Sequence, residues 1–155
     1  MKKIDSLNQV AEFHKTFNAP ILNTPTIPSK ERCDLRVSLL QEELNELKQA
    51  IEDNDIVEIA DALCDLQYVL SGAVLEFGLG EKFVELFNEV QRSNMSKACE
   101  TEEQAQETVE HYKTKGEEAH YEKSGDKFNV HRISDNKVLK NKYYSAANLK
   151  NIIEK

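Results

Sequence analysis

Residues 43–65, ELNELKQAIEDNDIVEIADALCD, contain the pattern from which the fold can be predicted. In its first half and just before it, apolar residues recur at helical spacing: Leu40, Leu44, Leu47 and Ile51. This periodicity predicts a helix over 30–52, and the almost uniformly apolar pattern that follows predicts a second helix over 55–77. Because only a short loop separates them, we expect the two helices to be antiparallel neighbours.

Five carboxylates interrupt the apolar surface of these two helices: Glu43, Glu46, Glu58, Asp61 and Asp65. A helix that is apolar nearly all round is typical of a buried element. Clustered carboxylates in such a setting repel one another and need partners. The two helices hold no run of Lys or Arg that could neutralise them, whereas Mg²⁺ prefers carboxylate oxygen. The alternative is that these acids are only the solvated faces of two amphipathic helices.

The rest of the chain contributes shorter elements around this pair. The expected helices cover 5–17, 81–97, a segment that Thr101 caps, and a short final segment that Ser145 caps. The expected hairpin pairs 127–133 with Val138-Leu139, and all three prolines lie in the loop 18–31. We therefore expect an all-α helical domain over 1–124, with a hairpin and final helix over 125–155 packed on it.

The helix at 81–97 carries a second polar group of interest. Asn94 and Lys97 fall close to its apolar face, which Phe83, Phe87 and Val90 define. A lysine that extends a buried stripe needs a polar partner, and a phosphate suits its point charge. The alternative is that this segment is only a frayed helix end whose lysine complements the helix dipole.

Three motifs in this order carry a family resemblance. They are Glu43-Leu44-Asn45-Glu46, then Glu58-Ile59-Ala60-Asp61 followed by Asp65, and then EVQRSNMSK at 89–97. Together they resemble the MazG-like and phosphoribosyl-ATP pyrophosphohydrolase-like members of the all-α NTP pyrophosphohydrolase superfamily, over roughly residues 10–98. Eleven residues separate the first two motifs, which favours the phosphoribosyl-ATP-like branch.

The resemblance implies a helical bundle that hydrolyses a nucleoside triphosphate to a monophosphate and pyrophosphate. It implies Mg²⁺, with Mn²⁺ as the alternative, on Glu43, Glu46, Glu58 and Asp61, with Asp65 as a further ligand. It also implies a homodimer or a dimer of dimers. The apolar pattern of 55–77 points the same way, because one chain of this length can hardly cover all of it.

Individual roles follow from these positions. Glu46 lies farthest from the buried stripe and is the predicted general base, with Glu43 beside it as the second catalytic carboxylate. The predicted phosphate-binding residues are Asn94, Lys97, Arg36 and Lys140. Phe17 and Asn18, together with Phe13, are the predicted contacts of the nucleobase. The basic segment 137–155 is expected either to close over the phosphates or to dock on the acidic body of the protein.

Composition excludes several other classes of protein. Residues 1–111 carry ten Lys/Arg against 22 Asp/Glu, which disfavours nucleic acid as a partner. No apolar run is long enough to span a membrane, and the three scattered cysteines suggest a reduced, cytoplasmic protein. A di-iron bundle would need two Glu-x-x-His motifs, and only Glu117 to His120 provides one. A non-catalytic helical interaction module that keeps the acids for structure remains the alternative function.

Overall fold

The computed structural model describes residues 4–155, which form two compact units that divide between Phe83 and Val84. The first unit holds α1 (Ser6–Thr16), α2 (Lys30–Glu52), α3 (Ile56–Glu76) and the 3₁₀ turn Gly80–Lys82. The second holds nearly all of α4 (Phe83–Met95), then α5 (Glu102–Lys113), β1 (Ala119–Ser124), β2 (Lys127–Arg132) and α6 (Lys150–Ile153). The expected mostly helical fold with a small hairpin is confirmed. The predicted division into domains at 124/125 stays a prediction.

No single helix within residues 4–155 is both long and apolar enough to cross a membrane. The segments Ile56–Glu76 and Gly80–Met95 satisfy that requirement only jointly, and a bend of 111° separates them.

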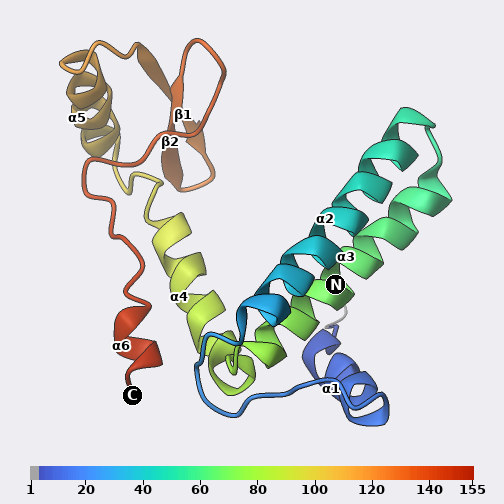
Figure 1. Ribbon diagram of the computed structural model, residues 1–155. Helices are drawn as coiled ribbons and strands as arrows, with labels where there is room; N and C mark the ends of the chain where they lie inside the picture. Colours follow the sequence, from blue (N-terminus) through green and yellow to red (C-terminus); the bar gives the residue numbers. More distant parts are fainter. Residues whose placement is uncertain (1–3) are drawn as a thin grey trace. The chain divides into compact units, whose positions relative to one another are not determined.

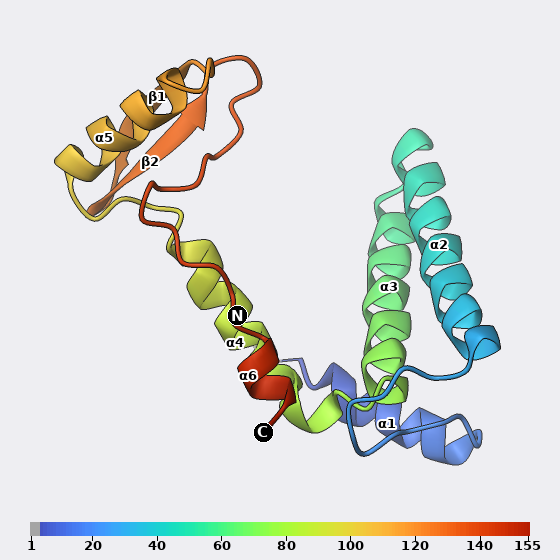
Figure 2. The same ribbon diagram turned by 60° about the vertical axis from the view of Figure 1, so that its left-hand side comes forward.

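The first unit is built on the antiparallel pair of α2 and α3, which lie side by side (Figures 1 and 2). Asp55 caps α3, because its Oδ1 accepts hydrogen bonds from the backbone N–H groups of Val57 (2.9 Å) and Glu58 (3.2 Å). Asn54 adopts a positive φ of 55° in the connection, which asparagine tolerates better than most residues. The expected antiparallel hairpin of helices is therefore confirmed.

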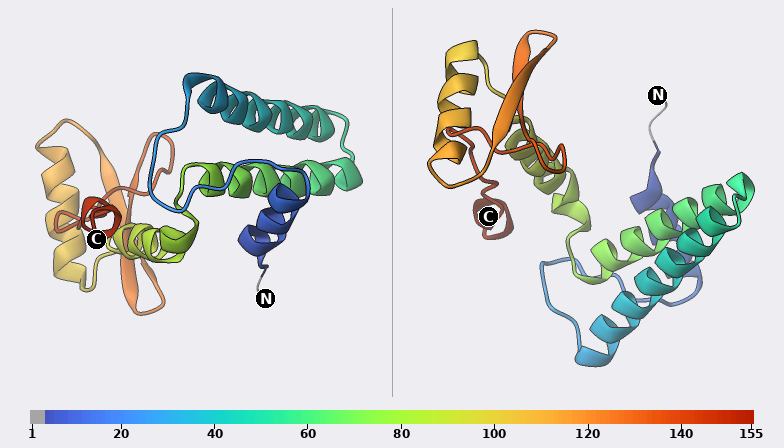
Figure 3. Two further views of the ribbon diagram at one scale, coloured as in Figure 1. Left: turned by 60° about the horizontal axis from the view of Figure 1, so that its bottom comes forward. Right: turned by 90° about the horizontal axis from the view of Figure 1, so that it is seen from above.

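The third helix of this unit, α1, packs against α3 (Figure 3), and the proline-containing loop follows it. Backbone hydrogen bonds fix this loop to the end of α3, from Leu22 N–H to the Leu75 carbonyl and from Thr26 N–H to the Phe77 carbonyl, both 3.0 Å long. Gly78 has a φ of +68°, and a Cβ atom there would lie 1.9 Å from the Thr24 carbonyl oxygen. The loop can pass this close to α3 only because the residue is glycine.

Most of α3 is only partly buried in the single chain. Burial is complete or nearly so around Ser71–Glu76, whereas Ile56 and Val57 at the start of the helix are 74% and 70% exposed. The predicted apolar stripe of α2 is also partly uncovered, since Leu44 is half-exposed. The expectation that one chain cannot cover all of α3 is thus confirmed, because α1 and α2 cover only part of its surface.

The second unit contains a two-stranded antiparallel sheet whose register pairs Ala119 with Arg132 and Ser124 with Lys127. The turn contains Gly125 at φ +62°, the conformation that tight hairpin loops require. The predicted pairing of 127–133 with Val138-Leu139 is present only as a single antiparallel bridge, between His131 and Val138. Backbone hydrogen bonds flank this bridge, from Leu139 N–H to the Val130 carbonyl (2.8 Å) and from Arg132 N–H to the Lys137 carbonyl (2.9 Å). The main partner of β2 is β1, which the sequence did not predict. The sequence of β1, AHYEKS, lacks apolar alternation, so periodicity could not reveal it.

The core of the second unit gathers residues from four separate segments: Cys99, Ala105, Val130 and Leu139. Backbone hydrogen bonds between Cys99 and Phe128 hold the start of this core against β2. Thr101 caps α5 as predicted, accepting from the N–H of Gln104 at 3.3 Å. The core explains why the compact unit extends well beyond the hairpin, since α5 and β2 share it.

The C-terminal segment runs along α4 and contacts it at both ends. Ser145 N–H donates to Ser96 Oγ (3.0 Å), Asn148 N–H donates to Glu89 (2.8 Å), and Lys155 pairs with Glu85 at 3.7 Å. The prediction that Ser145 caps the last helix is wrong, because α6 begins only at Lys150 and the Ser145 backbone is engaged with α4.

Candidate functional site

Glu43 is the point at which the carboxylates of α2 and α3 meet. Partial burial raises the pKa of the Glu43 carboxyl, and the charges of Asp65, Glu46, Glu42 and Asp61 raise it further. Asp61 and Asp65 belong to α3, so the carboxylates of the two helices lie close enough to act on one another. The sequence predicts only that Glu43 interrupts the apolar surface of α2, whereas the structure brings it within reach of the carboxylates of α3.

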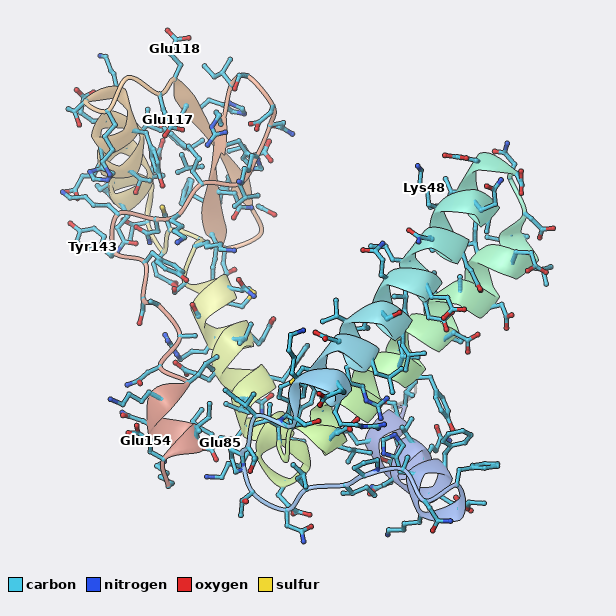
Figure 4. The ribbon with its side chains drawn as sticks, viewed as in Figure 1. Lys48, Glu85, Glu117, Glu118, Tyr143 and Glu154 are labelled. Carbon is cyan, nitrogen blue, oxygen red and sulfur yellow. The ribbon has the colours of Figure 1, made fainter. Side chains whose placement is uncertain are left out.

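These acids have no cationic partner within residues 4–155. The ion pairs of this part of the chain include none of the five acids Glu43, Glu46, Glu58, Asp61 and Asp65. Lys48 lies on α2 (Figure 4) and pairs with Glu52 at 3.7 Å instead. Glu46, Glu58 and Asp61 are exposed, and Glu43 and Asp65 are half-buried. The group is thus open to solvent and carries uncompensated negative charge.

The donor chemistry of this group fits a hard divalent cation, because every available atom is a carboxylate oxygen. As the side chains stand, no three His, Cys, Asp or Glu residues in the described part of the chain converge on one point that could hold a metal ion. Binding would therefore require carboxylate rotamers to change. Such changes are open to the three exposed acids, since no hydrogen bond or ion pair holds their side chains.

Arg36, a predicted phosphate ligand, instead lies in a buried ion-pair network. Its Nε donates to Glu76 of α3, and Arg32 Nε donates to the other carboxylate oxygen. His14 Nδ1 donates to the Pro20 carbonyl at 2.8 Å, which leaves Nε2 to accept from Arg36 Nη2 at 3.4 Å. Arg36 is 7% exposed and Glu76 1%. The network joins all three helices and gives Arg36 a structural partner in place of a phosphate.

Gly72 makes room for this network. A Cβ atom at Gly72 would lie 2.8 Å from Arg36 Nη1 and 3.0 Å from His14 Nε2. Burial by itself would raise the pKa of Glu76, but the hydrogen bonds and charges of Arg32 and Arg36 outweigh it and hold that pKa below its ordinary value. Glu76 is thus an ionised, buried acid with two guanidinium partners.

The other predicted phosphate ligands lie in the second unit. Lys97 Nζ donates to Asn94 Oδ1 at 2.9 Å, so the two side chains are neighbours at the end of α4. Lys140 lies over the ring of Tyr144, with Nζ 4.5 Å from the ring centroid. The Tyr144 hydroxyl is 2.8 Å from Ser93 Oγ, which places Lys140 near the same end of α4. The hydroxyl of Tyr143, labelled in Figure 4, donates to Glu107 at 2.6 Å, so Tyr143 does not share the Ser93 contact of its neighbour Tyr144.

The predicted base contacts lie at the end of α1. Phe17 is 65% exposed and its ring lies 4.4 Å from that of Phe13, centroid to centroid. Asn18 follows in the left-handed conformation, with a φ of 55°. An exposed aromatic pair of this kind can receive a planar ligand.

Residues 10–94 match the model of the phosphoribosyl-ATP pyrophosphohydrolase family. This chain belongs to that family. The match spans α1 to α4 and contains all five acids, and it confirms the resemblance that the three motifs carry. Membership in the family indicates a pyrophosphohydrolase activity in the general sense. An uncharacterized protein of Acanthamoeba polyphaga mimivirus is 24% identical, over 99% of this chain and 97% of its own length.

Two residues of this site had no signal strong enough to single them out in the sequence. Glu76 continues the stripe of Glu58, Asp61 and Asp65 along α3, but its partners on α2 lie 40 and 44 residues away in the chain. Tyr68 lies between the acids and Glu76 on α3 and contacts Phe13 of α1. Helical spacing could have placed both on the acidic face, although it could not reveal what they contact.

Proposed function

We propose that this family member is a Mg²⁺-dependent nucleoside triphosphate pyrophosphohydrolase that releases a nucleoside monophosphate and pyrophosphate. The observation that carries the proposal is the meeting of the α2 and α3 carboxylates around Glu43, where no lysine or arginine among residues 4–155 forms an ion pair with them. Such a group gains most from a ligand that brings positive charge. Family membership supplies the reaction class.

Glu43, Glu46, Glu58 and Asp61 would hold the metal ion, with Asp65 as a further ligand. Mg²⁺ is the expected ion and Mn²⁺ the alternative, because both favour oxygen donors. When bound, the ion supplies positive charge to the phosphate oxygens on which negative charge develops. Glu46, one of the three exposed carboxylates of the group, would accept the proton of the attacking water as general base. Glu43 would act beside it.

Residues of the second unit are proposed as phosphate ligands. Lys97 offers three N–H donors and Asn94 an amide, and their mutual hydrogen bond keeps the two groups together. Lys140 adds a further charge nearby. The contacts of 145–155 with α4 support a docking role for the end of the chain. Lys140 lies outside this docked segment and is therefore the basic residue of the tail that we propose as a phosphate ligand. In Lys140→Ala we expect a several-fold higher KM without a loss of thermal stability.

The direct test is hydrolysis of a panel of ribo- and deoxyribonucleoside triphosphates by the purified protein, with pyrophosphate release measured in Mg²⁺ and in a chelator. We expect activity only with the metal ion. Glu43→Gln, Glu46→Gln, Glu58→Gln and Asp61→Asn should each lower turnover by at least about a hundred-fold while the protein stays folded. Glu52→Gln is the matched control, because Glu52 lies on the same helix and pairs with Lys48.

The melting temperature provides a second readout of the metal site. Mg²⁺ that binds only the folded state must raise the melting temperature of the wild type. We expect this rise to be lost in the four variants and kept in Glu52→Gln. No hydrolysis of any nucleotide together with no rise in melting temperature would favour the non-catalytic helical interaction module instead.

A further inference from the structure

Three aromatic side chains form an exposed cluster on the first unit: Phe13, Phe17 and Tyr68. The rings of Phe13 and Tyr68 meet edge to face, with their centroids 5.6 Å apart, and the rings of Phe13 and Phe17 are 4.4 Å apart. All three remain well exposed, at 43%, 65% and 39%. Aromatic rings held in contact with one another yet open to solvent form a ready surface for another planar group.

This aromatic cluster continues the acidic face of α3. Tyr68 follows Asp61 by seven residues, which leaves the two side chains only about 20° apart around the helix. It follows Asp65 by three residues, a rise of about 4.5 Å, and Asp61 by a rise of about 10 Å. A ligand whose phosphates lie at the carboxylates and which extends along α3 therefore meets Tyr68 next.

The neighbouring side-chain amide of Gln67 is already engaged, whereas the Tyr68 hydroxyl is not. Gln67 donates to Ser71 Oγ at 3.1 Å and to Ser6 Oγ at 3.4 Å, so its amide ties α1 to α3. The Tyr68 hydroxyl makes no hydrogen bond with any residue in 4–155. Tyr68 thus presents both an aromatic face and an unused donor, the combination that suits a heterocyclic base.

We propose that Tyr68, with Phe13 and Phe17, is the surface on which the nucleobase of the substrate stacks. The inference rests on the proposed function and narrows it, because it makes the base itself a source of affinity. The substrate is then a nucleotide with a planar base rather than an inorganic polyphosphate. Every nucleobase has a planar face that can stack, so stacking on this surface supplies affinity for any base. Hydrogen bonds, including one from the Tyr68 hydroxyl, would then distinguish one base from another.

The test compares binding of a nucleotide with binding of its phosphates alone. Calorimetric titrations of the full-length protein in Mg²⁺ would use α,β-methylene deoxynucleoside triphosphates, which resist cleavage at that bridge, and inorganic tripolyphosphate, which has no base. Wild type should bind the tightest of the nucleotides at least about ten-fold more strongly than tripolyphosphate. Tyr68→Leu should remove most of that difference and leave tripolyphosphate binding unchanged.

Two further variants separate stacking from structural effects. Tyr68→Phe keeps the ring and should retain nucleotide affinity within about three-fold, with the change differing between bases. Ile27→Ala alters an exposed apolar residue on the loop after α1, away from the aromatic cluster, and should leave both affinities unchanged. Equal losses for nucleotide and tripolyphosphate in Tyr68→Leu would show a structural role and overturn the inference.

The outcomes also distinguish this inference from the proposed function. Wild-type protein that binds tripolyphosphate in Mg²⁺ as tightly as it binds nucleotides would overturn base stacking while leaving the metal site intact. Wild-type protein that binds neither ligand, with or without Mg²⁺, would overturn both. Unchanged nucleotide affinity in Tyr68→Leu would overturn base stacking alone.

Discussion

At the scale of the residue, the raised pKa of Glu43 predicts how the stability of the protein depends on pH. Its pKa in the folded chain is raised, so the folded state holds the proton more tightly than the unfolded state. The contribution of Glu43 to stability is therefore fully present below the ordinary carboxyl pKa of 4.5 and is lost as pH rises through the raised value. At neutral pH, without a divalent cation, the ionised Glu43 carboxylate therefore makes the folded state less stable than the protonated carboxyl would.

We expect Glu43→Gln to melt at a higher temperature than the wild type at neutral pH in the presence of a chelator, because the repulsion disappears. The difference should shrink as the pH falls below 4.5. Melting curves across this range, with Glu52→Gln as the control, measure it. A variant that is less stable than the wild type at neutral pH would contradict the assignment of Glu43 to a repulsive cluster.

Gly78 provides a second test at the same scale. Alanine there would adopt an unfavourable positive φ, and its Cβ would collide with the Thr24 carbonyl oxygen. The conformational part alone costs about 1–3 kcal/mol, and the collision adds to it. Gly125→Ala is the matched control, since its φ of +62° is similar and nothing lies within 4 Å of an added Cβ. Chemical denaturation should show a clearly larger loss for Gly78→Ala, and equal losses would mean that the loop does not pass close to α3.

At the scale of the element, the ion-pair network around Glu76 holds α2 against the end of α3. Removal of one partner of a buried pair leaves an uncompensated charge, at a cost of about 3–5 kcal/mol. We expect Arg36→Ala to lose this amount at neutral pH, as measured by denaturant titration. Glu52→Gln, which breaks an exposed pair, should cost no more than about 0.5 kcal/mol. A loss in Arg36→Ala as small as in the control would show that the network does not stabilise the helices.

The pH dependence of this network has the opposite sign from that of Glu43. Glu76 has a lowered pKa in the folded chain, so its contribution to stability is present above the ordinary carboxyl pKa and is lost as pH falls through the lowered value. The stability difference between wild type and Glu76→Gln should therefore be largest near neutral pH and diminish in acid.

At the scale of the whole molecule, exposed apolar side chains on α3 predict association of chains. Ile56, Val57, Leu63 and Leu70 are between 43% and 74% exposed in the single chain, and apolar area removed from water is worth about 25 cal/mol per Å². Light scattering at micromolar concentration should give at least twice the 17.7 kDa of one chain. We expect Leu70→Lys to weaken the assembly and Ile27→Lys, on an exposed loop, to leave it unchanged. A wild-type mass of 17.7 kDa would contradict the prediction.

Local sequence determined most of the helices and the order of the acids. The periodicity of 30–52 and 55–77, the short connection between them and the cap at Thr101 act between residues close in the chain, so the pattern predicts them well. The spacing of Glu43, Glu46, Glu58 and Asp61 likewise predicts on which face of its helix each acid lies. Together with the third motif, this spacing identified the family.

Contacts between distant parts of the chain depend on the packing of the helices and strands and could not be predicted from local sequence. From the sequence, Arg36 was a candidate phosphate ligand. In the structure it pairs instead with the buried carboxylate of Glu76, which lies 40 residues later in the chain. β1 could not be predicted from the sequence, because a polar strand carries no periodic apolar signal. It is a strand only because it pairs with β2. The same holds for Tyr68, whose contact with Phe13 depends on α1 crossing α3. Local spacing specifies the face of a helix on which a side chain lies, whereas its partner there is set by the packing of the whole chain.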